Sequence, residues 1–293
     1  MTERKFERMV TAAAHVPETL NMLRGITATD IAVHPFAHVV RQNALSPQVY
    51  ETLENEFPSL AQMLGGRSNF GSNEAIRLSV RQVLGSNQIS SNWRDFFAFH
   101  TSPDYWREIV RVFAAYLRQE FPHLEERVGR RFEDWRAVPR GYSGDAEVRL
   151  DCQFVMNTPV VAASSVKTPH VDLCDKILSS LYYFRPSQDK VSGGDLDLYA
   201  WRRKPRFVKH RTLQQDIDLS HTVPYAANTF VSFVNSEKSV HGVSPRGITT
   251  IPRRYINFIA ELPIHAFDPK QVSRWRKLLL PKEMRLSAHN DVY

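Results

Sequence analysis

Two histidines and one aspartate are the residues of this chain best suited to chemistry by their type and spacing. His170 and Asp172 stand two positions apart, and His241 follows much later in the sequence. Two imidazoles and one carboxylate can occupy one face of an Fe(II) ion and leave its other positions open for a chelating co-substrate and O2. The pattern therefore predicts a metal centre with open coordination positions.

Two adjacent arginines, Arg253 and Arg254, come shortly after the second histidine. A guanidinium group offers a rigid pair of donors that matches the two oxygens of a carboxylate. Neighbouring residues on a strand face opposite sides, so only one of the two can point toward the predicted metal centre. An arginine here predicts a binding site for a carboxylate-bearing co-substrate.

The elements that carry these residues are expected to be strands. On a strand, His170 and Asp172 would share one face because side chains alternate with a period of two. His241 would be delivered by a neighbouring strand, after the apolar run 228–234 and a short turn. Taken alone the His-x-Asp pair is a weak signal, since a buried histidine bonded to an aspartate is common in protein cores.

The second half of the chain predicts an antiparallel sandwich or barrel, because short β-rich runs follow one another without helices between them. We expect strands at residues 148–156, 160–162, 177–184, 196–201, 229–234 and 255–261. A further strand is expected at 31–40, leading into the same sheet.

The first half predicts mostly helices. Ser46-Pro47 and Ser102-Pro103 each supply an N-cap residue followed by a proline at the first helical position. Asp268-Pro269 signals a last helix, with Val272, Trp275 and Leu279 on one side. We divide the chain into a mostly helical region at 1–140 that packs on the core, a catalytic core at 141–263, and a C-terminal helix and tail at 264–293. All three are expected to form one structural unit.

Six motifs in order resemble the double-stranded β-helix core, a jelly-roll or cupin-like fold, of the 2-oxoglutarate/Fe(II) oxygenases. The resemblance is strongest to the prolyl 4-hydroxylase-like group and covers about residues 147–262. The motifs are Pro169-His-Val-Asp172, Leu181-Tyr-Tyr-Phe184, Gly193-Gly-Asp-Leu-Asp-Leu198, Asn228-Thr-Phe-Val-Ser-Phe233, His241-Gly-Val-Ser-Pro245 and Arg253-Arg-Tyr255. The implied fold is a mainly β core wrapped by N-terminal helices and a C-terminal helix.

The resemblance implies a role for each matching residue. Fe(II) would be bound by His170, Asp172 and His241. The arginine that pairs with the 5-carboxylate of 2-oxoglutarate matches Arg254, because the motif continues with a tyrosine, and Arg253 is the alternative one register away. The segment from His241 to Arg254 is longer than usual in this group, which leaves the register of the arginine open.

Other positions are implied by the same comparison. Tyr183, Leu181 and Leu196 match residues that line the co-substrate pocket, and Gly193-Gly194 would form a turn that lets the next strand approach closely. His221 is the alternative third metal ligand, but it lacks the Gly-Val-Ser-Pro context that follows His241.

The activity implied is that of a dioxygenase which uses Fe(II), 2-oxoglutarate and O2 and releases succinate and CO2. A carboxylate at Asp172 fills the position that halogenases of the superfamily leave for chloride, so hydroxylation of a C–H bond is expected. The substrate class favoured is a small molecule, a sugar or a carrier-bound intermediate. The alternatives are a peptidyl or protein hydroxylase and a non-catalytic cupin-like binding module.

The charge of the chain bears on its partners. Formal net charge is +7, and the segment 201–211 carries six Lys/Arg and no acid. Such a run is more often a solvated loop than a site, but it could form a clamp for an anionic substrate. Nucleic acid is disfavoured because no recognition motif accompanies the charge, and Ala260 stands where nucleic-acid dealkylases of the superfamily carry a second arginine.

Location is inferred from what the sequence lacks. No secretory signal begins the chain, and no run of about 18 apolar residues predicts a membrane span. Two cysteines, Cys152 and Cys174, are too few for a disulfide framework. We therefore expect a cytoplasmic enzyme with reduced thiols.

Overall fold

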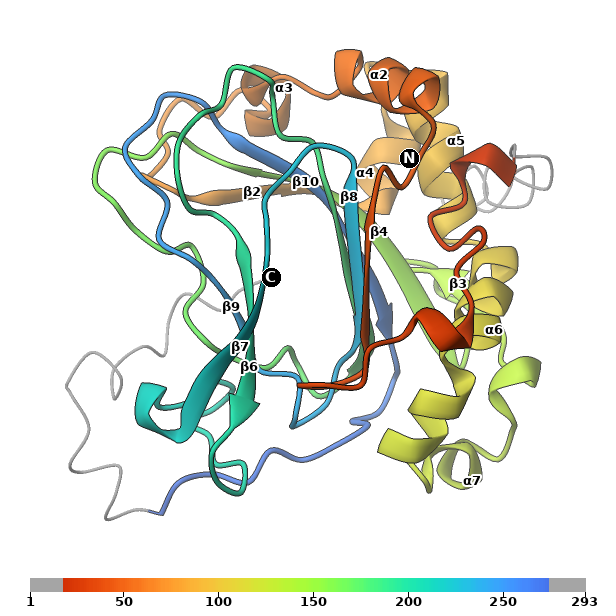
Figure 1. The fold of residues 1–293 in the computed structure, drawn as a ribbon. Coiled ribbons are helices and arrows are strands. Elements are labelled where there is room, and N and C mark those ends of the chain that lie inside the picture. Colours follow the sequence, from red (N-terminus) through yellow and green to blue (C-terminus); the bar gives the residue numbers. More distant parts are fainter. Residues whose placement is uncertain (1–17, 274–293) are drawn as a thin grey trace.

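The strands of the protein form two sheets that face each other (Figure 1). The structure is a computed structural model and describes residues 18–273. The main sheet has the order β1-β8-β5-β10-β4-β2, with β3 pairing in parallel beside β4, and the minor sheet has the order β7-β6-β9. The strands are β1 His38–Gln42, β2 Ala75–Leu78, β3 Ala137–Pro139, β4 Val148–Asn157, β5 Lys176–Tyr183, β6 Leu196–Trp201, β7 Ile217–Val223, β8 Thr229–Val234, β9 His241–Val243 and β10 Arg253–Glu261.

The helices come from the first half of the described chain, as predicted. They are α2 Pro47–Asn55, α3 Leu60–Leu64, α4 Val80–Gly85, α5 Ser91–His100, α6 Pro103–Glu120 and α7 Leu124–Val128. Short 3-10 turns lie at Glu18–Leu20, Ala28–Asp30, Phe132–Asp134 and Gln214–Asp216. Both predicted N-caps are confirmed: the hydroxyl of Ser46 accepts a hydrogen bond from the backbone N–H of Val49, and that of Ser102 accepts one from Tyr105.

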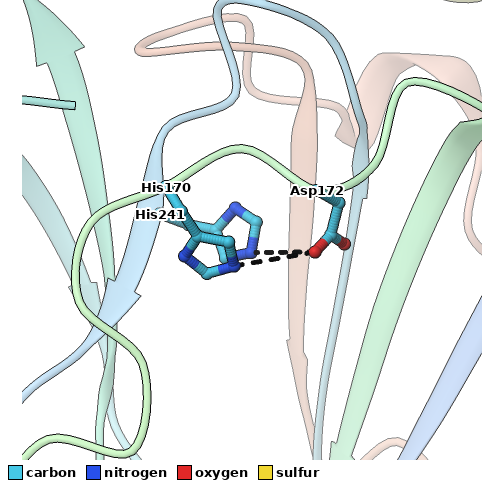
Figure 2. A group of neighbouring side chains, drawn as sticks. All are labelled: His170, Asp172 and His241. Atoms are coloured by element: carbon cyan, nitrogen blue, oxygen red, sulfur yellow. Dashed lines mark ion pairs between the residues drawn. The ribbon is translucent and has the colours of Figure 1, made fainter. Parts of the chain in front are cut away.

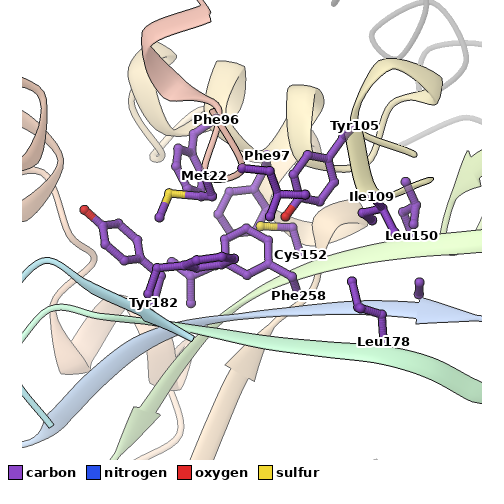
Figure 3. Packing of buried hydrophobic residues seen from close by; sticks show 14 of the residues in the cluster. Met22, Phe96, Phe97, Tyr105, Ile109, Leu150, Cys152, Leu178, Tyr182 and Phe258 are labelled. Atoms are coloured by element: carbon purple, nitrogen blue, oxygen red, sulfur yellow. The ribbon is translucent and has the colours of Figure 1, made fainter. Parts of the chain in front are cut away.

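The helices cover one face of the main sheet, and the minor sheet covers the other (Figures 1 and 3). Alternation along β4 produces this division, because Cys152 and Phe154 pack under the helices while Val155 packs toward the minor sheet. Figure 3 shows Phe96 and Tyr105 of the helices packed over Phe258 and Tyr182 of the sheet. Close packing of these buried aromatic side chains makes the main sheet a rigid support for the site.

Most predicted strands of the second half are confirmed within a residue or two. The run 160–162 is not a strand, since Val160 makes only an isolated bridge to Thr249. The strand expected at 31–40 begins only at His38. The sequence did not predict β2, β3 or β7, whereas β9 is the strand that was expected to carry His241. In β7 only the first and last residues are buried, so it lacks the apolar alternation that reveals a strand.

The ends of the chain are described only in part. No helix begins at Asp268-Pro269 within the residues described up to 273, and Trp275 and Leu279 lie outside them. The first half contributes β1, β2 and β3 to the main sheet as well as the helices, so it is less purely helical than expected. The division at 140 and 263 stays a prediction. No helix within 18–273 combines the length and apolar character needed to cross a membrane.

Candidate active site

His170, Asp172 and His241 converge between the two sheets (Figure 2). Nε2 of His170 lies 3.6 Å from Oδ1 of Asp172, and Nε2 of His241 lies 4.0 Å from the same oxygen. The three candidate ligand atoms are all within 4.8 Å of one another. The two histidines are only 5% and 7% exposed. This geometry could hold one metal ion.

The protonation of both histidines suits metal binding. Nδ1 of His170 contacts the carbonyl oxygen of Thr168 at 2.9 Å, and Nδ1 of His241 contacts that of Ser239 at 2.9 Å. A carbonyl only accepts, so each Nδ1 must carry the proton, which leaves the Nε2 lone pair directed at the site. Burial lowers the pKa of both rings, that of His241 to about 4. Both imidazoles are therefore neutral at neutral pH.

Asp172 is held as a carboxylate. Its Oδ2 accepts a hydrogen bond from the hydroxyl of Ser179 at 2.6 Å, which turns Oδ1 toward the histidines. Burial by itself would raise the pKa of Asp172, but the nearby positive charge of Lys176 opposes this effect, and the pKa of Asp172 lies well below its usual range. The group therefore offers one anionic oxygen to a cation.

The two histidines are joined through their backbones, not by the regular strand that was expected. His170 exchanges two backbone hydrogen bonds of 2.9 Å with His241, the first residue of β9. His170 itself lies outside any strand, and Asp172 lies in the loop before β5. Pro169 has no N–H and interrupts the ladder at this point. A Cβ on Gly242 would stand 3.1 Å from the nitrogen of Pro169, so glycine at this position permits the close approach.

Asn235, which the sequence did not reveal, ties the two ligand loops together. Its Oδ1 accepts from the backbone N–H of Asp172 (3.2 Å) and from the hydroxyl of Ser239 (3.1 Å). Its Nδ2 donates to the carbonyls of Leu173 (3.1 Å) and Lys176 (2.8 Å). The only local signal is an amide directly after the buried strand β8. Its partners are distant in sequence, so their identity could not be predicted.

A pocket of about 540 Å³ opens beside the three-residue group. Leu181 and Leu196 line it. Tyr183 is not among the lining residues, but its ring centre lies 5.1 Å from the guanidinium carbon of Arg253, which is one of them. Further lining residues, to which the sequence assigned no role in a pocket, are Asn73, Glu74, Ala75, Arg77, Val166, Lys167, Lys176, Ser179, Phe233, Val243, Tyr255 and Asn257.

Of the two adjacent arginines, Arg253 points into this pocket. The prediction that Arg254 is the one that points inward was therefore wrong. Arg253 is 2% exposed, and its Nε donates to the carbonyl of Gly194 at 2.8 Å. Arg254 points to the opposite face, where it pairs with Glu54 at 3.0 Å. Alternation along β10 places every second residue from Arg253 on the pocket side, so Tyr255 and Asn257 also line it.

Arg253 lies in a box of aromatic rings with donors left over. Its guanidinium carbon is 5.1, 4.9 and 4.6 Å from the ring centres of Tyr183, Tyr225 and Tyr255. Its Nη2 has no hydrogen-bond partner, and neither do the hydroxyl of Tyr183 and Nδ2 of Asn157, although all three atoms are buried. Among residues 18–273 no carboxylate pairs with Arg253. Buried donors left in this state are expected to meet a ligand.

Gly193 and Gly194 form the turn that was predicted, with φ of 80° and 81°. A Cβ on Gly193 would overlap the carbonyl oxygen of Pro245 at 1.9 Å, and one on Gly194 would stand 3.3 Å from Cδ of Arg253. The turn brings the two chain segments together and presents the carbonyl that holds Arg253.

The basic segment 201–211 does not line the pocket. The guanidinium of Arg202 pairs with Asp218, and that of Arg203 lies 3.9 Å from Asp216. His221 lies exposed on β7 with its ring 6.0 Å from that of His38, away from the three-residue group. Of the two candidates for the third ligand, the structure brings only His241 into contact with Asp172.

Comparison with known proteins identifies the fold. No family model matches the sequence, and no curated protein matches it either. A structure of prolyl 4-hydroxylases from Phytophthora capsici superimposes with a TM-score of 0.51 at 12% identity and covers 85% of this chain and 67% of that one. A Pseudomonas putida prolyl-4-hydroxylase gives a TM-score of 0.45 at 11% identity and covers 84% of this chain and 100% of that one. The first of these likenesses confirms that the chain has the double-stranded β-helix fold of the prolyl 4-hydroxylase-like oxygenases.

Proposed function

We propose that the protein is an Fe(II)- and 2-oxoglutarate-dependent dioxygenase that hydroxylates an unactivated C–H bond and releases succinate and CO2. The observation that carries this proposal is a single pocket with the group His170, Asp172 and His241 and the buried guanidinium of Arg253 both in its lining. Such a pocket suits a chelating acid with a second carboxylate at its other end.

The residues fit Fe(II) in number, type and protonation. Two buried, neutral imidazoles and one partly buried carboxylate form the donor set of the facial sites that bind this ion. When bound with 2-oxoglutarate and O2, the iron supplies the oxidising chemistry. The carboxylate of Asp172 fills a position that chloride would otherwise take, which supports hydroxylation.

Arg253 and Tyr183 fit the distal carboxylate of 2-oxoglutarate. Nη2 of Arg253 and the hydroxyl of Tyr183 are buried donors without partners, and leaving such a donor unsatisfied costs about 1–3 kcal/mol. A carboxylate that accepts from both would remove this penalty and gain the strength of a charge-assisted bond. Leu181 and Leu196, also in the pocket lining, would shield the chain of the co-substrate from water.

The substrate proposed is a small molecule, a sugar or a carrier-bound intermediate. A peptidyl or protein hydroxylase and a non-catalytic cupin-like binding module are the alternatives. Use of O2 and a cytoplasmic location belong to the same proposal.

An anaerobic titration with Fe(II) and 2-oxoglutarate tests the function. We expect a weak visible charge-transfer band that appears only when both are present, and succinate release once O2 is admitted. Absence of the band in the purified protein contradicts the proposed cofactors. A band without succinate release across a broad substrate screen favours the binding module.

A further inference from the structure

A second arginine is fully buried close to Arg253. Arg246, in the loop between β9 and β10, is 1% exposed. A Cβ built on Gly194 would stand 3.4 Å from Nε of Arg253 and 3.5 Å from Nη1 of Arg246, so both guanidinium groups flank the same glycine. Both also contact the ring of Tyr225, at 4.9 Å for Arg253 and 5.5 Å for Arg246. Two like charges buried this close repel each other, so the arrangement needs an explanation.

Arg246 engages a buried acid. Its Nη2 donates to Oδ2 of Asp189 at 2.7 Å and to the carbonyl of Ile251 at 3.0 Å. The side chain of Asp189 has no exposed surface, and its Oδ1 accepts from the backbone N–H of Val191 at 3.1 Å and lies 3.6 Å from Nη2 of Arg185. Both oxygens of Asp189 are thus occupied, and this carboxylate is not available to Arg253.

Arg253 is left without an acid of the protein. Asp195, which follows Gly194, accepts from the backbone N–H of Tyr225 at 2.7 Å and lies 3.4 Å from the hydroxyl of Ser244. Among residues 18–273 no ion pair reaches Arg253, and its buried Nη2 has no hydrogen-bond partner. A guanidinium already paired with one carboxylate binds a second one poorly, because the two anions repel each other. The free state of Arg253 is therefore what a ligand carboxylate requires.

Packing alone does not account for Arg246. Its Nε and Nη1 are buried and make no hydrogen bond, and the face of Tyr225 gives them only a cation–π attraction. Burial of donors in this state is unfavourable, and apolar side chains in place of Arg246 and Asp189 would fill the same space without that cost. Arg246 does not line the pocket, so any effect on a ligand must pass through Arg253.

We propose that Arg246 is a positioning residue of the co-substrate site: by engaging Asp189 it keeps the guanidinium of Arg253 free for the distal carboxylate of 2-oxoglutarate. This inference rests on the function proposed above and adds to its site a residue outside the pocket. Without Arg246, the charge of Asp189 would be offset only by Arg185, at 3.6 Å. Its negative potential would then reach Arg253 through a medium of low dielectric and oppose the incoming carboxylate. The site would lose its preference for an oxo acid with a second carboxylate.

Binding of two matched oxo acids tests the inference. 2-Oxoglutarate is compared with 2-oxopentanoate, which has the same chain length but ends in a methyl group, by calorimetry on the protein loaded anaerobically with Fe(II). The ratio of the two dissociation constants measures the preference for the distal carboxylate. Arg246→Gln should lower this preference by about 10-fold or more, through weaker binding of 2-oxoglutarate alone. A merely structural role of Arg246 would weaken the binding of both acids alike.

Further variants assign the effect to the bond between Arg246 and Asp189. Arg246→Gln combined with Asp189→Asn should restore most of the preference, because the uncompensated anion is removed as well. The matched control is Arg185→Gln, which removes the same charge from a side chain that also contacts Tyr225 but leaves the bond between Arg246 and Asp189 in place. This control should keep the preference. Should Arg246→Gln not fold, Asp189→Asn alone decides, since it must leave the preference undiminished.

Four results would overturn the inference: an unchanged preference in Arg246→Gln, no recovery in the double variant, an equal loss in Arg185→Gln, or a reduced preference in Asp189→Asn. The charge-transfer band with 2-oxoglutarate is recorded in the same samples. A normal band in the unmodified protein together with any of these results defeats this inference alone. A missing band in the unmodified protein defeats the proposed function.

Discussion

Arg253 and Arg254, adjacent in the chain, carry their guanidinium groups to opposite faces of β10. Arg253 donates to the carbonyl of Gly194 on the pocket side, and Arg254 donates to the carbonyl of Phe184 at 3.1 Å and pairs with Glu54 under the helices. One side chain is therefore available to a ligand, and the other joins α2 to the main sheet.

Replacing each arginine by alanine should separate these roles. Arg253→Ala should weaken 2-oxoglutarate binding by on the order of 2–5 kcal/mol, because a charge-assisted contact to a buried carboxylate is lost. Arg254→Ala should leave the 2-oxoglutarate requirement unchanged and lower the free energy of unfolding by about 1 kcal/mol or less, as for partly exposed ion pairs. Succinate release against 2-oxoglutarate concentration and urea unfolding measure the two effects. Glu54→Gln should behave like Arg254→Ala. If Arg254→Ala raised the 2-oxoglutarate requirement, Arg254 would be the residue that binds the co-substrate.

The metal group is tested by removing one ligand at a time. His170→Ala, Asp172→Ala and His241→Ala should each abolish the charge-transfer band and succinate release, because two remaining ligands cannot hold the ion in a facial site. His221→Ala is the matched control, since this histidine is exposed on β7 and should leave both signals intact. If the band persisted in His241→Ala and disappeared in His221→Ala, the third ligand would be misassigned.

Ser179 should matter for the metal although it does not contact it. Its hydroxyl holds Oδ2 of Asp172, so Ser179→Ala should let the carboxylate rotate and lower Fe(II) affinity by about 10–100-fold. Ser180→Ala provides the comparison, because the hydroxyl of Ser180 bonds to that of Ser232 at 2.8 Å on the other face of β5. Affinity is followed by the band as Fe(II) is added at saturating 2-oxoglutarate. Equal effects of the two substitutions would mean that general loosening of the strand is responsible.

Gly194 is expected to act through Arg253. An added Cβ would stand 3.3 Å from Cδ of Arg253, and the residue has φ of 81°. Gly194→Ala should therefore raise the 2-oxoglutarate requirement in addition to a strain of about 1–2 kcal/mol. Gly129→Ala carries a similar strain at φ of 77° without any atom within 4 Å of the new Cβ. Only Gly194→Ala should alter co-substrate binding. If both variants raised the 2-oxoglutarate requirement, a specific effect of Gly194→Ala on Arg253 would be refuted.

Local chemistry explains why the metal group could be predicted and the arginine could not. The types of His170, Asp172 and His241 indicate a metal whatever the exact backbone, and the structure brings all three together even though the expected strand is absent. The inward face of β10 depends instead on where the strand starts, and a shift of one residue reverses every side chain. The loop of unusual length before β10 concealed that register.

Residues that converge from distant parts of the chain were beyond prediction. Arg77 and Lys167 line the same pocket because β2, which carries Arg77, joins the edge of the main sheet. This strand is too short to stand out in the sequence. Asn235 likewise has partners in two loops that the fold alone brings together. The strand β7 was missed for a different reason, since Leu219 is the one apolar residue in its exposed middle and no apolar alternation results.

His100 should make the protein sensitive to acid independently of the metal site. The His100 side chain, at the end of α5, is 1% exposed and packs among the rings of Phe96, Tyr105 and Phe258. Its Nδ1 donates to the carbonyl of Phe96 at 2.7 Å, and its Nε2 accepts from the N–H of Met22 at 3.4 Å, so the neutral form fits and the charged form does not. Burial lowers the pKa of His100 to about 3, although the bond to Phe96 opposes this shift.

The unfolded chain therefore takes up a proton at His100 below about pH 6.5 while the folded protein does not, and stability must fall as pH drops through this range toward 3. At pH 5 the loss from this one residue should be on the order of 2 kcal/mol relative to pH 7.5. His100→Gln removes the titration but also the ring packing, so the variant should be less stable at pH 7.5 and its deficit should shrink by about that amount at pH 5. Urea unfolding of the metal-free protein at both pH values measures the change, with His123→Gln as the control because His123 is exposed. A deficit that stays constant between pH 7.5 and pH 5 would mean that His100 is not kept neutral by its surroundings.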